Sequence, residues 1–308
     1  MFNIITKRFW YFLISIIVIV VCVVSLATFR LKPGIEFSSG SVMTVGFEQQ
    51  LETAELQQAL ADSGYASAII QQIGDEDFLI RLPKLGSGDK TELEASLSSA
   101  FNSIVVKEFD SVSPMVATET TRDAAIAVAV AGIGILLYIA WAFRKMPNPF
   151  RYGLCALVAL THDALIALGV FSILGGLLDW EIDLMFLTGI LAVIGYSVNN
   201  TVVVFDRIRE NLLKGERFDF ETVVNSSLVE TLSRSLNTSL TTLFVVLALL
   251  LFIGTAIQNF AVVLLVGIFA GTYSSLFIAP SLLVVWQKRE WRRFIPGLPM
   301  ADGKAGGR

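Results

Sequence analysis

The sequence predicts an α-helical membrane protein with six transmembrane helices and one small α+β domain outside the membrane. Hydrophobic residues make up 54% of the 308 residues and charged residues only 16%, with a mean hydropathy of +0.68. A soluble domain cannot hide that much apolar surface. Six apolar runs have about the length that a helix needs to cross the bilayer, and one long polar segment interrupts them after the first run.

The six apolar runs are the candidate membrane spans, and they cover residues 9–29, 124–143, 153–174, 184–204, 236–253 and 260–286. The fifth is the shortest, at about 18 residues. Lys7 and Arg8 precede the first run, as basic residues precede a signal peptide. Because this run is too long for a signal peptide and no A-x-A site follows it, we expect an uncleaved anchor.

The basic residues of the loops predict the orientation of the chain. They gather before the first span, between the second and third, between the fourth and fifth, and after the sixth. The opposite loops carry either three acids or no charge. Because loops rich in Lys and Arg stay on the cytoplasmic side, both termini are expected in the cytoplasm, with residues 288–308 as a tail.

The polar segment alternates between strand and helix patterns. A strand pattern in residues 41–48 precedes a helix pattern that Gly64 ends. Two β-rich runs follow, "SAIIQQI" and "DFLIRL", separated by the turn signal "GDE". The run "DKTELEASLSSAF" predicts a second helix with Asp89 as its N-cap, and "SIVVKEF" predicts a last strand. This β-α-β-β-α-β order is typical of a ferredoxin-like domain.

The expected domains are therefore residues 1–32 (N-terminus and first span), 33–120 (ferredoxin-like extracytoplasmic domain) and 121–287 (spans two to six), followed by the tail. Between the fourth and fifth spans, residues 215–234 carry apolar side chains at helical spacing, among them Phe218, Val223 and Leu228. This segment is expected either to lie along the cytoplasmic interface or to extend the fifth span.

Asp163 is the most informative polar residue, because it lies at the centre of the third span beside His162. An unpaired carboxylate in hydrocarbon is costly, so Asp163 is expected to face the interior of the bundle and to find partners there. Two interpretations stay open: a neutral, hydrogen-bonded structural acid, or a proton or ion relay.

Asn199 and Asn200 lie in the cytoplasmic half of the fourth span, where amides often join helices by hydrogen bonds. Asn199 shares a helix face with Asp206, and Asn200 shares a neighbouring face with Arg207. Arg234, at the start of the fifth span, is either an anchor whose head reaches the interface or a cation that faces an acid across the bundle.

Glycines mark the expected close contacts between helices. Gly267 and Gly271 form a GxxxG in the sixth span, and Ser274 and Ser275 continue this series of small residues. Gly195 adds a small-residue surface to the fourth span. The sequence contains one histidine and two isolated cysteines, Cys22 and Cys155, so no metal site or disulfide is expected. Because no nucleotide-binding or nucleophile motif is present either, we expect neither a cofactor nor an enzyme activity.

Several ordered motifs resemble those of the SecF family, the membrane subunits that work with SecD beside the Sec channel. They are "PGIEFSSG", similar to the family pattern G-I-D-F-x-G-G, then "SVSPMVATE", "ALTHDALIALGVFSILG", "IGYSVNNTVVVFDRIREN", "TLSRSLNTSLTT" and "GTYSSLFIAPSLL". These motifs cover nearly the whole chain.

The resemblance implies a bundle of the resistance–nodulation–division superfamily in the bacterial inner membrane, paired with six spans of SecD as an obligate partner. It implies that the ion gradient, of protons or of sodium, moves the outer domains and so helps late steps of preprotein export. The other implied partners are the SecYEG channel, SecA indirectly, YidC, the unfolded preprotein and membrane lipid, but no nucleic acid.

At one position the sequence departs from the family pattern. The usual form in the fourth span is G-Y-S-x-N-D, whose acid is considered the main protonation site and faces an arginine at the position of Arg234. Here an amide, Asn200, takes the place of that acid and cannot titrate. Three explanations stay open: reliance on Asp163, Asp206 or SecD carboxylates; a different coupling ion; or an amide introduced by design.

Two other functions are weighed against the export role. One is a small-molecule or lipid exporter of the same superfamily, although its substrate-binding domain would be small for that task. The other is a purely structural assembly subunit, which the amide at Asn200 favours.

Overall fold

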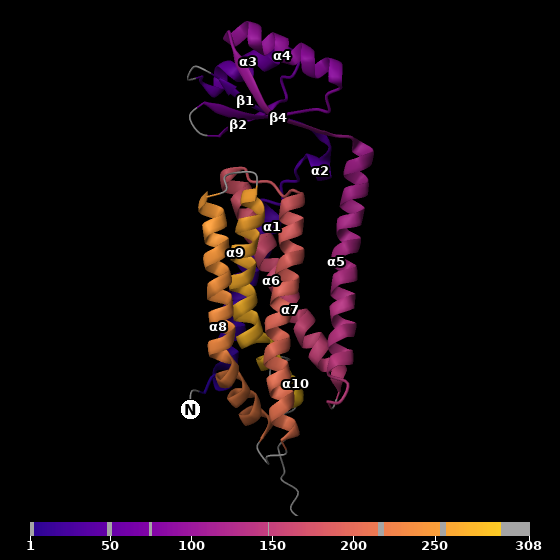
Figure 1. Cartoon of the computed structure of the whole chain (residues 1–308), viewed down its shortest axis with the longest axis vertical. Coiled ribbons are helices and arrows are strands. Elements are labelled where there is room, and N and C mark those ends of the chain that lie inside the picture. Colours follow the sequence, from indigo (N-terminus) through magenta and orange to yellow (C-terminus); the bar gives the residue numbers. More distant parts are fainter. Residues whose placement is uncertain are drawn as a thin grey trace, which may run out of the picture. The chain divides into compact units, whose positions relative to one another are not determined.

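The computed structural model describes residues 3–47, 51–73, 76–146, 148–214, 219–252 and 257–290 (Figure 1). Some sequence predictions fall outside these residues. They concern Phe218, the turn at residues 74–75, the end of a strand at 48, the end of a span at 253 and the tail beyond 290. The chain forms two compact units, a membrane unit (Met1–Leu31, Val128–Trp180 and Met185–Arg308) and an outer unit (Lys32–Ala127 and Glu181–Leu184).

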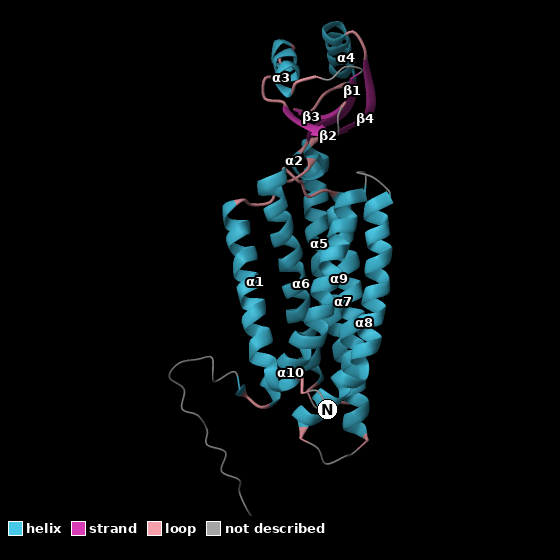
Figure 2. Cartoon of the chain, turned by 90° about the vertical axis from the view of Figure 1, so that its left-hand side faces the viewer, coloured by secondary structure: helices cyan, strands magenta, loops and turns pink. Residues whose placement is uncertain are grey.

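The outer unit has the predicted order of strands and helices. It contains β1 (Gly40–Phe47), α3 (Thr53–Asp62), β2 (Ile69–Ile73), β3 (Asp77–Leu82), α4 (Ser87–Phe101) and β4 (Ile104–Val112). The strands form one antiparallel sheet in the order β2-β3-β1-β4. Both helices cover the same face of this sheet (Figure 2). The prediction of a ferredoxin-like domain is therefore confirmed.

The core of the outer unit follows from the alternation of its strands. Alternate residues of β1 and β3, such as Met43, Val45 and Ile80, are fully buried, and they pack with the apolar faces of α3 and α4. Leu60 and Leu97 are the matching fully buried residues of the two helices. The hydrophobic period of the sequence thus decides which face of each element is covered.

One local prediction needs correction. Asp89 is not the N-cap of the second helix, because α4 begins at Ser87 and Asp89 occupies its third position. From there, its Oδ2 atom accepts the backbone N–H of Gly86 at 2.9 Å. The carboxylate still stabilises the start of the helix, but it does so by reaching back to the cap residue.

A short connection leads into β1 and carries the α2 turn (Ile35–Ser38). Gly34 donates its N–H to the carbonyl of Ile182 at 2.8 Å, and Ile182 donates to Lys32 at 2.8 Å. Arg81 forms an ion pair with Glu181. Ser39, after the turn, has φ 66° and ψ 160°, a conformation that is nearly restricted to glycine.

The membrane unit confirms the prediction of six spanning helices. The six runs long and apolar enough to cross a bilayer are Ile5–Thr28, Pro114–Ala142, Pro149–Leu178, Leu184–Leu213, Phe220–Phe252 and Gln258–Gln287. They correspond to η1 (Ile5–Lys7) with α1 (Arg8–Thr28), α5, α6, α7, α8, and α9 (Gln258–Tyr273) with η3 (Ser274–Ile278) and α10 (Ala279–Gln287). The N-terminal part of α5 belongs to the outer unit. Of the two alternatives for residues 215–234, the described part extends the fifth span as the start of α8.

Small residues allow close approach of the helices in this bundle. A Cβ atom at Gly267 of α9 would lie 2.9 Å from the Cβ of Val193 on α7, and one at Gly271 would lie 3.0 Å from the Cβ of Ser197. Val193 and Ser197 are four residues apart on α7, and the glycines that face them are four residues apart on α9 in the same order. The two helices therefore run side by side in the same direction. The glycines of the predicted GxxxG therefore form a helix contact.

Candidate ion-relay site

The polar centre of the bundle is Asp163, midway along α6 and 1% exposed. Its Oδ2 atom accepts hydrogen bonds from the hydroxyl groups of Ser197 on α7, at 2.6 Å, and Ser274 of η3, at 2.8 Å. Its Oδ1 atom lies 3.0 Å from Nδ1 of His162. A carboxyl group in this position is held by side chains from three different helical segments.

His162 extends the network to a fourth helix. Its Nε2 atom lies 3.1 Å from the hydroxyl of Ser15 on α1, and its ring lies nearly parallel to that of Tyr273, with the centroids 6.2 Å apart. The hydroxyl of Tyr273 donates to the carbonyl of Tyr11. With an ionised Asp163, the arrangement is satisfied by a neutral imidazole that donates from Nδ1 and accepts from Ser15 at Nε2.

Two features of the sequence bring the hydroxyl groups to Asp163. Gly271 has no side chain and leaves the space in which Ser197 approaches the carboxyl. The helix then widens into the π-helix η3, in which Ala279 donates its N–H to the carbonyl of Ser274, five residues earlier. Pro280 has no N–H to donate, so the ordinary helical pattern is interrupted at this level.

Asn200 is buried on α7 but does not join this network. It is 2% exposed, and its Nδ2 atom has no hydrogen-bond partner among the described residues. A buried amide N–H without a partner costs about 1–3 kcal/mol. The Nδ2 group of Asn200 therefore occupies a protected position without a hydrogen bond to the described part of the chain.

The remaining polar residues that the sequence predicted for the site lie on exposed faces. Asn199 is exposed on α7, and Arg234 is exposed on α8, where its side chain forms no ion pair with any described residue. Gly195 was expected at a helix contact, but a Cβ atom there would meet nothing within 4 Å, because this side of α7 is open. Among the polar site residues predicted from the sequence, the described structure brings together only Asp163 and His162.

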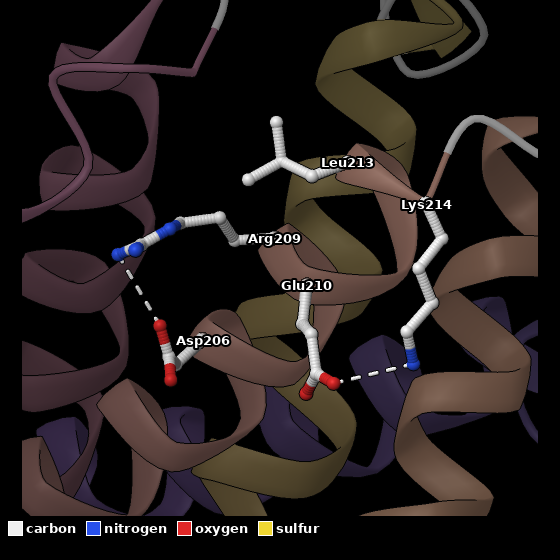
Figure 3. A pocket seen from close by; sticks show the side chains of 5 residues that line it. All are labelled: Asp206, Arg209, Glu210, Leu213 and Lys214. Atoms are coloured by element: carbon white, nitrogen blue, oxygen red, sulfur yellow. Dashed lines mark ion pairs between the residues drawn. The ribbon is translucent and has the colours of Figure 1, made fainter.

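Asp206 lines an open groove at the end of α7, shown in Figure 3 with Arg209, Glu210, Leu213 and Lys214. Asp206 pairs with Arg209 at 3.3 Å, and Glu210 pairs with Lys214 at 3.2 Å. The charges of the groove are therefore matched within one exposed helix face, and such pairs contribute little to stability.

The sequence did not identify Ser15 and Ser197 as parts of the site, and it marked Ser274 only as a small packing residue. The available signal was the spacing of small residues along α7, since Ser197 lies eight residues after Gly189 on the face that contacts α9. That signal predicts close packing. It does not reveal that the hydroxyl of Ser197 points to a carboxyl on a third helix.

The fold and the site define a multi-pass membrane protein with a ferredoxin-like domain after its first span and a buried carboxyl at the centre of its helices. The family model "Protein export membrane protein SecD/SecF, C-terminal" matches residues 92–289, and "SecD/SecF GG Motif" matches residues 24–51. The chain belongs to the SecD/SecF family.

Individual relatives agree with this assignment. The chain is 42% identical to "Protein translocase subunit SecF" of Thermobaculum terrenum, over 95% of this chain and 96% of that protein. It is 34% identical to "Protein translocase subunit SecDF" of Bacillus subtilis, over 94% of this chain but only 38% of that longer protein.

A solved structure supports the fold. The crystal structure of SecDF, a translocon-associated membrane protein from Thermus thermophilus, superposes with a TM-score of 0.83 at 33% identity. The match covers 94% of this chain and 39% of the SecDF chain. The chain therefore corresponds to a part of the SecDF polypeptide.

Proposed function

We propose that the chain is an accessory subunit of the Sec protein translocase that works with SecD in late steps of preprotein export. The observation that carries this proposal is the similarity to relatives named SecF along nearly their whole length. The role is one of binding and movement, without covalent catalysis. It places the chain in the bacterial inner membrane with both termini in the cytoplasm and with the ferredoxin-like domain outside.

SecD is the partner that the relatives support, because some of them carry SecD and SecF as one SecDF chain. The surface of the membrane unit also favours a helical partner. Arg234, Asn237 and Thr238 are exposed on α8 within a membrane-spanning helix, where polar side chains facing lipid are costly. A second bundle packed against α7 and α8 would cover them. SecYEG, SecA and YidC are proposed as further partners from the family alone.

We further propose that the ion gradient drives this subunit through the carboxyl network around Asp163. Moving one charge across the membrane yields about 2.3 kcal/mol per 100 mV, enough to shift a rearrangement of a few kcal/mol. A carboxyl that contacts α7 and η3 at once is a suitable group for such coupling, because a change in its charge alters contacts on several helices.

The test is depletion of the subunit in membranes that retain SecA and the Sec channel. We expect ATP-driven initiation to continue while late, gradient-dependent translocation slows. Export that keeps its normal rate and its normal response to the gradient would contradict the proposal. Co-purification of the subunit with SecD from membranes that have not been depleted tests the partner, and recovery of SecYEG without SecD would argue against it.

A purely structural assembly role is the second candidate, because Asn200 replaces the acid of the family pattern and is buried, with no partner for Nδ2 among the residues that the structure describes. The Asn200→Asp substitution distinguishes the two functions. A changed dependence of translocation on the gradient supports ion coupling, whereas unchanged translocation together with weaker SecD binding supports the structural role.

A further inference from the structure

We infer that Asp163 is the proton-binding group of this chain and that Ser274 transmits its protonation state to the π-helix η3 and to α10. The inference deepens the proposed gradient coupling and rests on it for its biological meaning. It assigns the proton to α6, whereas the family pattern has its acid at the position of Asn200 on α7.

The surroundings of Asp163 fit a carboxyl that alternates between charged and neutral forms. In the charged form, Oδ2 accepts from two hydroxyl groups and Oδ1 accepts from His162, so the buried charge is solvated by three donors. No Lys or Arg is paired with it in the described part of the chain. A fixed cation would hold the carboxylate permanently charged, while hydroxyl groups can serve both forms.

The hydroxyl groups can serve both forms because each is donor and acceptor at once. When one proton binds Oδ2, the new O–H must donate, and the nearby hydroxyl oxygens become its acceptors. Ser274 has a second acceptor within reach, since its Oγ lies 3.3 Å from the carbonyl of Gly271. Protonation therefore turns the Ser274 hydroxyl from Asp163 to Gly271. The proton comes from the aqueous phase, so the O–H bond of the acid forms as an O–H bond of hydronium breaks and leaves water.

The other titratable neighbours are His162, which contacts Oδ1, and Tyr273, which lies beside the imidazole. From the remaining packed elements, the contacts are Ser15 on α1, Ser197 on α7 and Gly271 on α9. His162 positions the carboxyl through Oδ1, while the change of charge occurs at Oδ2. Asn200 cannot bind a proton in its place, and Asp206 is exposed beside Arg209.

The π-helix η3 is the element that transmits the change in protonation of Asp163 to α10. Ser274 is its first residue and supplies both the hydroxyl for Asp163 and the carbonyl for Ala279. π-helical turns are often found at functional sites, since their register is less regular than that of an α-helix. Seven residues after Ser274, Ser281 is fully buried and its Oγ has no partner in the described structure. A change in register would give this hydroxyl a new environment.

The test uses the full chain with SecD in lipid bilayers and infrared difference spectra recorded as the pH is changed. Every acid of the sample, Glu36 among them, gives a protonated-carboxyl band at low pH, so the spectra of Asp163→Asn are subtracted from those of the wild type. We expect the subtraction to leave one component that grows at low pH and vanishes at high pH, and Asp206→Asn, the control acid, should retain this component. Identical pH-dependent spectra of the wild type and Asp163→Asn would overturn the inference.

Ser274→Ala keeps the carboxyl and tests the transmission, even if Asp163→Asn does not fold. We expect its carboxyl band to stay but to shift, because one hydrogen bond to Oδ2 is lost. The protection of amides in residues 274–281, which is their exchange rate corrected for the intrinsic pH dependence of exchange, should change with pH in the wild type. Ser274→Ala should lose this change in protection, while Ser281→Ala keeps it. Equal pH dependence in Ser274→Ala and the wild type would overturn the role of Ser274.

The same samples separate this inference from the proposed function. If Asp163 titrates as expected but Asp163→Asn leaves gradient-dependent translocation unchanged, the proton site stands and the proposed coupling fails. If Asp163→Asn gives the same pH-dependent spectra as the wild type while translocation still responds to the gradient, the export role stands and the group that couples it to the gradient lies outside the Asp163 network.

Discussion

The hydroxyl of Ser197 on α7 lies 2.6 Å from the Oδ2 atom of Asp163 on α6, and both side chains are almost fully buried. This bond joins two spanning helices at the level where α9 widens into the π-helix. Losing the hydroxyl would leave the carboxyl with one hydrogen bond fewer at a position that is almost fully buried from solvent.

We expect Ser197→Ala to lower the free energy of unfolding by about 2 kcal/mol, because a buried acid loses a charge-assisted hydrogen bond. The measurement is thermal unfolding in detergent followed with a thiol-reactive dye, since Cys22 and Cys155 are both buried. Ser281→Ala is the matched control, with a buried hydroxyl that has no partner in the described residues, and should cost less. Equal losses in both variants would contradict the importance of the Ser197–Asp163 bond.

We expect Gly267→Ala to destabilise the bundle by about 1–3 kcal/mol, because its new methyl group would overlap Val193 on α7. The same unfolding assay measures the effect. Val193→Ala in the same chain should recover part of the loss by making space. Gly195→Ala is the control on the open side of α7 and should be neutral or stabilising by up to about 1 kcal/mol. Destabilisation by Gly195→Ala as large as by Gly267→Ala would refute this packing.

We expect Ser39→Gly to stabilise the outer unit by about 1 kcal/mol. Ser39 has φ 66° and ψ 160°, and the family pattern G-I-D-F-x-G-G has glycine at this position. The strain of a side chain in this region, about 1–3 kcal/mol, exceeds the entropy that glycine loses on folding. Pulse proteolysis of the outer unit in urea measures the change.

The neighbouring Ser38→Gly serves as the control for that measurement. Ser38 lies in the α2 turn with ordinary helical geometry, and its hydroxyl donates to the carbonyl of Gly34 at 2.9 Å. This variant should lose stability, because the glycine relieves no strain and the bond is removed. A gain from Ser38→Gly, or a loss from Ser39→Gly, would show that the backbone at Ser39 is not strained.

We expect Glu36→Gln to remove a decline in the stability of the outer unit as the pH rises. Burial raises the pKa of Glu36, and the charges of Asp183 and Asp110 raise it further, while its own backbone hydrogen bond and Arg81 lower it. The folded protein thus binds this proton more tightly than the unfolded chain. The resulting stability is fully present below the unfolded pKa, about 4.3, and is lost as the pH rises through the folded pKa.

The comparison of Glu36→Gln with the wild type is made by pulse proteolysis at matched pH values, so that changes in protease activity cancel. The two proteins should be similar near pH 4, and the variant should be more stable near pH 7. Glu55→Gln on α3, whose carboxyl is exposed, is the control and should follow the wild type. A constant difference between Glu36→Gln and the wild type at all pH values would contradict the titration of Glu36.

The sequence by itself determined the six spans, the order of the outer unit and the importance of Asp163. Each follows from a local or one-dimensional property: the length of an apolar run against the bilayer, the period of buried residues, and the cost of a charge in hydrocarbon. The start of α8 shows the limit, since its amphipathic pattern suits both a surface helix and the extension of a span.

Only the tertiary structure decided which residues contact Asp163 and which glycines form helix contacts. Gly195 and Gly267 are the same residue type in apolar helices, yet one faces open space and the other faces Val193. Ser197 and Ser281 are both buried serines, but only Ser197 donates to the carboxyl. The physical reason is that these contacts depend on how each helix is rotated about its axis relative to its neighbour. That rotation is set by packing between residues that lie far apart in the sequence.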